Sequence, residues 1–223
     1  MVEIKVPVVR NILEVNERLA QENRKIFDEK KILVLNLMSS PGAGKTSVLE
    51  RTAEALQGRY TIAVIEGDIQ SSLDAERLQR KGVQAVQINT DGACHLDSNM
   101  VRIALESLQL DFVDLLVIEN VGNLVCPAEF NLGEHHKVTI LSVAEGDDKP
   151  AKYPLMFQIS SVLLVNKIDL LPYLDCDLDV IHQRAKELNP LQHIFDISCR
   201  TGEGLEAWTA WLEAQIQEKK NLP

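Results

Sequence analysis

Aromatic residues, basic charge and long apolar runs are all scarce in this sequence of 223 residues. With aromatics at 4%, the apolar load falls on Val, Ile, Leu and Ala, as suits a sheet packed between helices. Lys and Arg number 23 against 33 Asp and Glu, a net charge of −10. That balance argues against nucleic acid as a partner, because phosphate contacts need a basic face. No apolar run reaches membrane-spanning length and residues 1–10 lack the apolar core of a signal peptide, so we expect a cytoplasmic protein without a membrane partner.

Cysteine is also sparse, and its four residues are dispersed along the chain, at Cys94, Cys126, Cys176 and Cys199. This spacing argues against a small disulfide scaffold. In a reducing cytoplasm such cysteines are thiols or metal ligands rather than disulfide partners. What the sequence does have is 45% hydrophobic residues, in a chain long enough to bury the core of one α/β domain.

Short β-branched runs alternate with amphipathic segments along the chain. A helix is expected first, over residues 11–27, followed by a buried strand over 31–37 and a helix over 45–56. Further strands are predicted at residues 60–65, 83–89, 113–119, 137–143, 161–165 and 193–197, and further helices include 100–108, 179–188 and 205–217. Strands that alternate with helices are typical of right-handed crossovers and a mainly parallel sheet. Ligands of such a sheet bind in the loops at the carboxyl ends of its strands.

The segment SSPGAGKT, residues 39–46, follows the first predicted strand and opens a predicted helix, the context of a phosphate-binding loop. Gly42 and Gly44 let the backbone approach a phosphate with its N–H groups turned inward, and the helix N-terminus adds positive charge. Lys45 would reach the β- and γ-phosphates, and the Thr46 hydroxyl would ligate Mg²⁺. Ser39 replaces the first glycine of the usual pattern, which a small polar residue can do if its φ stays negative. The alternative is an ordinary Gly-rich turn. The nucleotide-binding candidates in this segment are Gly42, Ala43, Gly44, Lys45, Thr46 and Ser47.

Residues 166–169, NKID, follow another predicted strand at its carboxyl end. Asp169 could accept both N1–H and N2–H of guanine, a donor pair that adenine lacks, while Asn166 bonds the base edge and the Lys167 stem packs along it. Placed several strands after a phosphate-binding loop, this motif favours GTP over ATP. Ser198 and Cys199, in SCRTGEG after the last strand, resemble the loop that completes a guanine pocket in P-loop GTPases. A plain strand-to-helix turn is the alternative for that stretch.

Hydrolysis needs acidic groups near Mg²⁺ and a residue that orients water. Asp68 follows the second predicted strand, and Glu119 ends the fourth, where a Walker-B acid would lie. Gly122 could bring its backbone N–H near a γ-phosphate, and Asp74 could join Thr46 and Asp68 around Mg²⁺. A solvated carboxylate is the alternative for each acid. No glutamine is placed to orient water, so we expect slow hydrolysis. The candidate catalytic residues are Lys45, Asp68 and Glu119.

Six segments together closely resemble the HypB family of GTPases: NLMSSPGAGKTSVLE, VIEGDIQSSLDAERL, INTDGACHLD, ENVGNLVCPAEFNLGEHHKV, SVAEGDDKPAKYPLMF and NKIDLL. The resemblance spans nearly the whole chain. It implies a P-loop NTPase fold, with residues 1–30 as an amino-terminal helical extension and 31–223 as a GTPase domain with an internal metal site. It also implies hydrolysis of GTP to GDP during nickel insertion into NiFe-hydrogenase, and a homodimer promoted by GTP or metal. The expected partners are a HypA-type nickel carrier and the hydrogenase large subunit.

The resemblance places ligands for Ni²⁺ or Zn²⁺ at Cys94, His95 and Cys126. Thiolate and imidazole suit both metals. Adjacent residues of a strand point to opposite faces, so Cys94 and His95 can converge only on a loop or at a helix start. Two buried cysteines and a capping histidine are the alternative. His135 and His136 are expected at a solvated strand start without a metal role.

The chain departs from the family at its beginning, MVEIKVPVVRN, which lacks the Cys-x-x-Cys-Gly-Cys motif or histidine-rich stretch of many members. Metal handling is therefore expected to rest on the internal site rather than on storage. Lys149 and Lys152 are candidates to reach a nucleotide across a dimer. Two other functions stay open. One is a nickel- or zinc-binding protein whose nucleotide site is mainly structural, and the other is a urease-type accessory GTPase, against which CHLD and NLVCP count.

Overall fold

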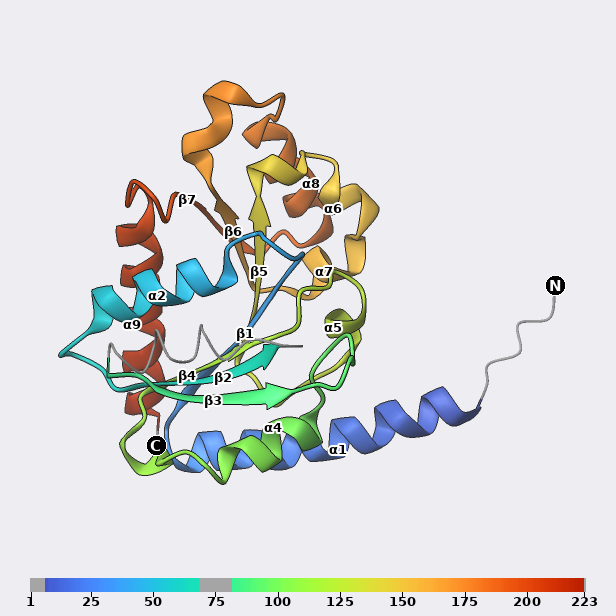
Figure 1. Cartoon of the computed structure of the whole chain (residues 1–223), viewed down its shortest axis with the longest axis vertical. Coiled ribbons are helices and arrows are strands. Elements are labelled where there is room, and N and C mark those ends of the chain that lie inside the picture. The colour runs from blue at the N-terminus through green and yellow to red at the C-terminus, as the bar shows by residue number, and fades with distance from the viewer. Residues whose placement is uncertain (1–6, 69–81, 223) are drawn as a thin grey trace.

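The computed structural model describes residues 7–68 and 82–222, in which the strands form one seven-stranded sheet (Figure 1). The strands are β1 (Leu33–Ser39), β2 (Ile62–Asp68), β3 (Gln84–Asn89), β4 (Leu115–Glu119), β5 (His136–Ser142), β6 (Val162–Asn166) and β7 (His193–Ile197). Their order is β3-β2-β4-β1-β5-β6-β7, and each neighbouring pair is parallel. The predicted parallel α/β fold is confirmed, with strand ends displaced by a few residues.

The central strand β1 shows why this sheet must be covered on both faces. Leu33, Leu35 and Leu37 belong to one apolar cluster, whereas Val34 and Met38 belong to clusters on the other face. Successive side chains of a strand point to opposite faces, so a continuous apolar run needs helices on both sides.

Two groups of helices provide that cover. On one face lie α2 (Lys45–Leu56) and α9 (Leu205–Asn221), whose Leu49, Trp208 and Leu212 enter the core. The other face is covered by α1 (Pro7–Glu29), α4 (Ser98–Leu105), α5 (Cys126–Glu129), α7 (Pro154–Ile159) and α8 (Leu178–Leu188). Figure 1 shows α2 and α9 on one side of the sheet, with α1 and α4 side by side on the other.

Short helices in the connections escaped prediction. They are α5, α6 (Lys149–Lys152), α7 and the 3₁₀ helices η1 (Leu110–Phe112), η2 (Val143–Glu145) and η3 (Ile168–Tyr173). Elements of three to six residues are too short to show helical periodicity. The signal they do carry is a proline in the first turn of α5, α6 and α7.

The carboxyl-terminal half of α1 packs onto the sheet. Phe27 is fully buried among residues of β1, β2 and α4. Asn23 Nδ2 donates hydrogen bonds to the carbonyl oxygens of Ser98 and Leu132, over 2.9 and 3.3 Å. These bonds hold α1 against the start of α4 and against the segment between β4 and β5. The division of the chain at residue 30 stays a prediction. Among the described helices, none has the length and apolar character of a membrane span.

Candidate functional site

The loop between β1 and α2 turns at two glycines with left-handed backbone. Their φ angles are +77° at Gly42 and +105° at Gly44, a region that residues with a Cβ atom rarely adopt. A Cβ atom on Gly44 would also lie 2.5 Å from Nδ2 of Asn166. Glycine is therefore needed twice over, and the loop brings its backbone to the N-terminus of α2 as an anion-binding loop does.

Ser39 shows how the loop forms without its usual first glycine. It is the last residue of β1 and is fully buried. Its Oγ donates a hydrogen bond to the carbonyl oxygen of Ser40 over 2.6 Å and accepts one from Nζ of Lys45 over 3.1 Å. A small hydroxyl side chain therefore fits the entry turn and orients the lysine along the loop.

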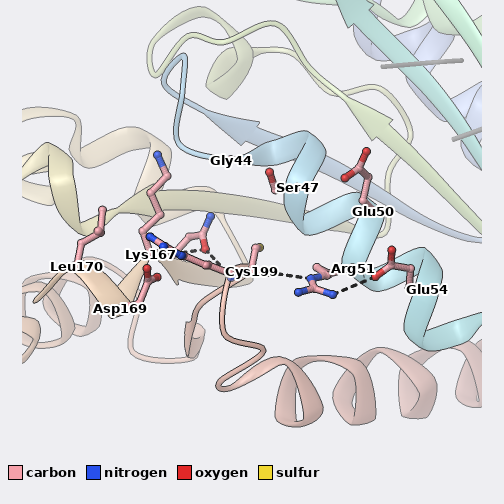
Figure 2. A pocket seen from close by; sticks show the side chains of 11 residues that line it. Gly44, Ser47, Glu50, Arg51, Glu54, Lys167, Asp169, Leu170 and Cys199 are labelled. Atoms are coloured by element: carbon pink, nitrogen blue, oxygen red, sulfur yellow. Dashed lines mark hydrogen bonds and ion pairs between the residues drawn. The ribbon is translucent and has the colours of Figure 1, made fainter. Parts of the chain in front are cut away.

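Three segments that the sequence singled out line one cavity of about 460 Å³ (Figure 2). Figure 2 shows Ser47 and Glu50 of α2 on one side of this cavity, and Lys167 and Asp169 on the other. The predicted nucleotide-binding residues among its lining are Gly44, Ser47, Asn166, Lys167, Asp169 and Cys199. Segments more than a hundred residues apart meet here because the carboxyl ends of parallel strands share one edge of the sheet.

Hydrogen bonds hold the NKID segment against the phosphate-binding loop. Asn166 Nδ2 donates to the carbonyl oxygen of Ala43 over 2.9 Å, and Nζ of Lys167 donates to the preceding carbonyl oxygen of the loop over 2.7 Å. Ser198 Oγ donates to Oδ1 of Asp169 over 2.6 Å. The last predicted segment thereby orients the carboxylate that faces the cavity.

Arg51 is a cavity residue that sequence analysis missed. Its Nε donates to the carbonyl oxygen of Cys199 over 2.8 Å, and its guanidinium pairs with Glu54 over 3.2 Å, as Figure 2 shows. Arg51 therefore fastens the loop after β7 to α2. Its one sequence signal, a helical pairing with Glu54, does not point to a site.

Burial raises the pKa of the Cys199 thiol to about 11, so this side chain stays protonated at neutral pH.

Glu119 and Gly122 lie close to the phosphate-binding loop. Thr46 Oγ1 donates a hydrogen bond to Oε1 of Glu119 over 3.0 Å, and the Glu119 side chain is largely buried. A Cβ atom on Gly122 would lie 3.1 Å from Pro41, so its missing side chain lets the loop after β4 contact the phosphate-binding loop. Both residues therefore contact the phosphate-binding loop, so a change in the position of this loop would alter their contacts.

Two predicted Mg²⁺ ligands have no described side chain. Asp68 ends β2, but its side chain lies outside the described part of the structure. Asp74 lies outside the described residues altogether. Their roles stay predictions.

Cys94, His95 and Cys126 come together at one point. Their ligand atoms all lie within 4.8 Å of one another, and theirs is the one such His/Cys/Asp/Glu group among the described residues. Cys94 and His95 lie in the loop between β3 and α4, where Cys94 Sγ is 3.4 Å from His95 Nδ1, and Cys126 opens α5. Soft thiolate and imidazole donors at this spacing fit a single Ni²⁺ or Zn²⁺ ion.

Neighbouring side chains orient this group. Asn123 Nδ2 donates to the carbonyl oxygen of Cys94 over 3.4 Å, which joins the two ligand-bearing loops. The His95 ring lies against Phe130, with ring centroids 3.9 Å apart. A hydrogen bond with the Cys126 thiol raises the pKa of Cys94, and burial lowers the pKa of His95. The imidazole is thus neutral and ready to coordinate, whereas thiols release protons when they bind a metal.

The prediction that His135 and His136 lie at the start of a strand is confirmed, because β5 begins at His136, but the prediction that this start is solvated is wrong. The His135 side chain is 11% exposed. Its Nδ1 accepts a hydrogen bond from the Val34 amide over 3.0 Å, and its Nε2 lies 3.0 Å from Oδ1 of Asp28. His136 is half-buried and lies 3.0 Å from the Ser161 hydroxyl. Both imidazoles serve the packing of the strand start, and neither belongs to the metal-ligand group of the described residues.

Lys149 and Lys152 lie on α6. Lys149 Nζ is 3.9 Å from Glu145, and Lys152 pairs with an aspartate one turn earlier. Glu145 in turn accepts a hydrogen bond from Ser40 of the loop and forms a capping box with Ser142. The capping box is visible in the sequence as Ser-x-x-Glu, but the contact with Ser40 is not.

Comparison with known proteins agrees with this geometry. Residues 33–196 match a family model described as CobW/HypB/UreG, nucleotide-binding domain. A hydrogenase maturation factor HypB from Azotobacter vinelandii is 53% identical over 208 residues, which cover 93% of this chain and 69% of the relative. The crystal structure of HypB from Helicobacter pylori in complex with nickel has a TM-score of 0.87 at 39% identity, over 91% of this chain and 95% of that one. The signal recognition particle receptor FtsY from Elizabethkingia anophelis, at 15% identity and a TM-score of 0.56, shares the fold alone.

The glycine loop at the N-terminus of α2, the parallel sheet and these matches define a nucleotide-binding protein of the P-loop class. Within that class, the chain belongs to the HypB family of hydrogenase maturation factors. The family resemblance seen in the sequence is thereby confirmed.

Proposed function

We propose that this protein is a metal-regulated GTPase that hydrolyses GTP to GDP and phosphate and assists nickel insertion during maturation of NiFe-hydrogenase. The observation that best supports GTP as the nucleotide is the position of the Asp169 carboxylate. Ser198 holds this carboxylate at the cavity, and Gly44 and Ser47 line the cavity from the other side. Guanine offers two adjacent N–H donors to such a carboxylate, and adenine does not. GTP therefore complements the cavity better than ATP.

Lys45, Thr46 and Glu119 are the described residues that we assign to hydrolysis. Phosphoryl transfer is catalysed mainly by positioning and by stabilisation of negative charge. Lys45 supplies a positive charge at the β- and γ-phosphates. Thr46 and Glu119, already 3.0 Å apart, offer hard oxygen ligands for Mg²⁺, and Asp68 and Asp74 would complete its shell. Bound Mg²⁺ would neutralise phosphate charge as the leaving group departs.

The group formed by Cys94, His95 and Cys126 is proposed to bind Ni²⁺ or Zn²⁺. Its two thiolates and one imidazole suit either ion, and a three-residue site leaves a further coordination position open. The similar protein from Helicobacter pylori was crystallised in complex with nickel. Gly122 packs against the phosphate-binding loop, and Cys126 lies four residues further along the chain. The segment from Gly122 to Cys126 therefore connects the metal group to the phosphate-binding loop.

The partners follow from the family. We propose a homodimer that GTP or metal promotes, with Lys149 and Lys152 as candidates to reach the nucleotide of the second copy. We also propose a HypA-type nickel carrier as donor and the hydrogenase large subunit as recipient, in the cytoplasm. All four cysteines are free, which suits a reducing compartment.

The test of this function is turnover of GTP and ATP by the wild type and by Lys45→Ala, with Ni²⁺ added to parallel samples. We expect turnover of GTP in preference to ATP, a change in rate with Ni²⁺, and loss of turnover in Lys45→Ala. The control is Lys30→Ala, because Lys30 pairs with Asp111 at the surface. Absence of guanine preference, or Lys45→Ala as active as Lys30→Ala, contradicts the proposal.

A further inference from the structure

The loop that carries two metal ligands and the loop that carries Gly122 share one buried hydrogen-bond acceptor. Asn120 Oδ1 accepts hydrogen bonds from the backbone N–H groups of Leu96 and Val121, each over 3.0 Å. Leu96 directly follows His95, and Val121 directly precedes Gly122. Asn120 and Leu96 are fully buried, so water cannot replace either bond.

The same side chain is anchored to the strand that leads into the phosphate-binding loop. Asn120 Nδ2 donates to Oδ1 of Asn36 in β1 over 3.2 Å, and Asn36 Nδ2 donates to Oε1 of Glu134 over 3.2 Å. The Asn120 backbone N–H donates to the carbonyl oxygen of Leu37 over 3.0 Å. The network fixes which side of the Asn120 amide is oxygen, because two donors face one side and an acceptor faces the other.

Close packing continues this connection at both ends. A Cβ atom on Gly67 would lie 2.7 Å from Cγ of Leu96, so the Leu96 side chain is pressed against β2. At the other end, Gly122 lies against Pro41 of the phosphate-binding loop, where a Cβ atom would be 3.1 Å from the proline. Neither loop can shift without strain on the shared amide, because packed interiors switch between discrete arrangements rather than deform smoothly.

We propose that Asn120 is the positioning residue that couples the nucleotide site to the metal group, through the two hydrogen bonds that its Oδ1 accepts. This inference rests on the proposed function. Its orientation of the Leu96 amide holds Cys94 and His95 in the loop geometry that brings them to Cys126. Its orientation of the Val121 amide holds Gly122 at the phosphate-binding loop. A change in the position of either loop is transmitted to the other through the Asn120 side chain.

The experiment measures Ni²⁺ affinity of the full chain with and without a non-hydrolysable GTP analogue, for the wild type, Asn120→Ala and Thr139→Ala. Thr139 is an equally buried polar residue on β5 that bonds the Ser160 hydroxyl over 2.6 Å and is the matched control for lost polar packing. We expect Asn120→Ala to lose about 10-fold or more in Ni²⁺ affinity without nucleotide, as residues that orient metal ligands do. The ratio of affinities with and without the analogue should fall toward one. Thr139→Ala should keep the wild-type ratio.

Hydrogen exchange gives a second readout that does not depend on metal. The amides of Leu96 and Val121 should lose protection in Asn120→Ala and keep it in Thr139→Ala. If Asn120→Ala does not fold, Asn36→Ala decides instead, because it removes the anchor of the Asn120 amide and should shift the ratio in the same direction.

Three results would overturn the inference. Asn120→Ala could bind Ni²⁺ as tightly as the wild type, or it could bind Ni²⁺ more weakly but keep the wild-type ratio of affinities with and without the analogue. The third is a ratio of one in the wild type itself. GTP turnover of the wild type is measured in the same samples. If the wild type does not turn over GTP, the proposed function itself is contradicted. If the wild type is active but Asn120→Ala keeps the wild-type ratio of Ni²⁺ affinities, only the coupling role of Asn120 is contradicted.

Discussion

The hydroxyl of Thr46 donates a hydrogen bond to Oε1 of Glu119 across 3.0 Å, joining the first turn of α2 to the carboxyl end of β4. Two oxygen atoms of the type that hard metal ions prefer thus meet next to Lys45, and the Glu119 side chain is largely buried. A carboxylate that is already held in place could bind a cation beside a bound phosphate without first losing conformational freedom. This pair is the part of the site that we expect to serve the chemistry of GTP cleavage.

Replacement of Glu119 by Gln should therefore lower turnover more than nucleotide binding. The amide keeps the size of the side chain and an acceptor for Thr46 but removes the negative charge. We expect kcat for GTP to fall on the order of 100-fold, with KM changed by less than about 3-fold. Steady-state phosphate release measures both values. A variant with kcat close to that of the wild type would show that Glu119 has no role in the chemical step.

Gly44→Ala should lower GTP affinity, in addition to the stability that is lost through backbone strain. Its φ of +105° disfavours alanine, and the added Cβ atom would lie 2.5 Å from Asn166 Nδ2. The control is Gly58→Ala, which has a φ of +76° and no atom within 4 Å of the new Cβ. Both variants should lose about 1–2 kcal/mol of unfolding free energy, but Gly44→Ala alone should lose GTP affinity. Equal GTP affinities in the two variants contradict the placement of Asn166 at the nucleotide.

Stability should fall as the pH drops from about 6.5 toward 4, because of His135. Burial lowers the pKa of this histidine from 6.5 to about 4, despite its bond with Asp28. In that window the unfolded chain binds a proton that the folded chain does not, so acid favours unfolding. Between pH 7 and pH 5 the loss should be about 2 kcal/mol from this residue. Urea denaturation at both pH values measures it. His135→Asn should be less stable at pH 7 but show a smaller loss on acidification, and an equal loss contradicts the assignment.

Metal affinity should depend on Cys94 and Cys126 but not on the other cysteines. Serine at either position replaces a soft thiolate with a poor ligand, and we expect Ni²⁺ affinity to fall by more than about 10-fold. Cys176→Ser is the matched control, since Cys176 lies outside the metal-ligand group. Titration with Ni²⁺, followed by thiolate-to-metal charge-transfer absorption, measures each affinity. Wild-type binding by Cys94→Ser would remove this residue from the site.

The sequence contained enough to predict the fold and the segments of the nucleotide site. Short apolar runs bounded by turns marked every described strand, and Gly44 and Asp169 line the cavity at which the motifs predict a nucleotide. Parallel strands bring such loops to one edge of a sheet whatever the details of packing. Motif and topology together therefore predict the neighbourhood without any knowledge of individual contacts.

The contacts within that neighbourhood could not be predicted. Arg51 reaches the carbonyl of Cys199 across a separation of 148 residues, and Ser40 reaches Glu145 across 105. Such pairs leave no local pattern. The error at His135 has the same origin, because the polar sequence around it resembles a solvated strand start. Residues of α1, such as Asp28, approach it only in the folded chain.

The most direct measurement of the account is nucleotide binding by Asp169→Asn, compared with the wild type by titration calorimetry using GTP and XTP. In the proposed binding mode, the Asp169 carboxylate accepts hydrogen bonds from N1–H and N2–H of guanine. An asparagine amide instead offers one donor and one acceptor, which match the 2-carbonyl and N1–H of xanthine. We predict that the variant loses GTP affinity by about 100-fold and prefers XTP, while the wild type prefers GTP. Identical affinities of wild type and variant for both nucleotides would contradict the guanine site.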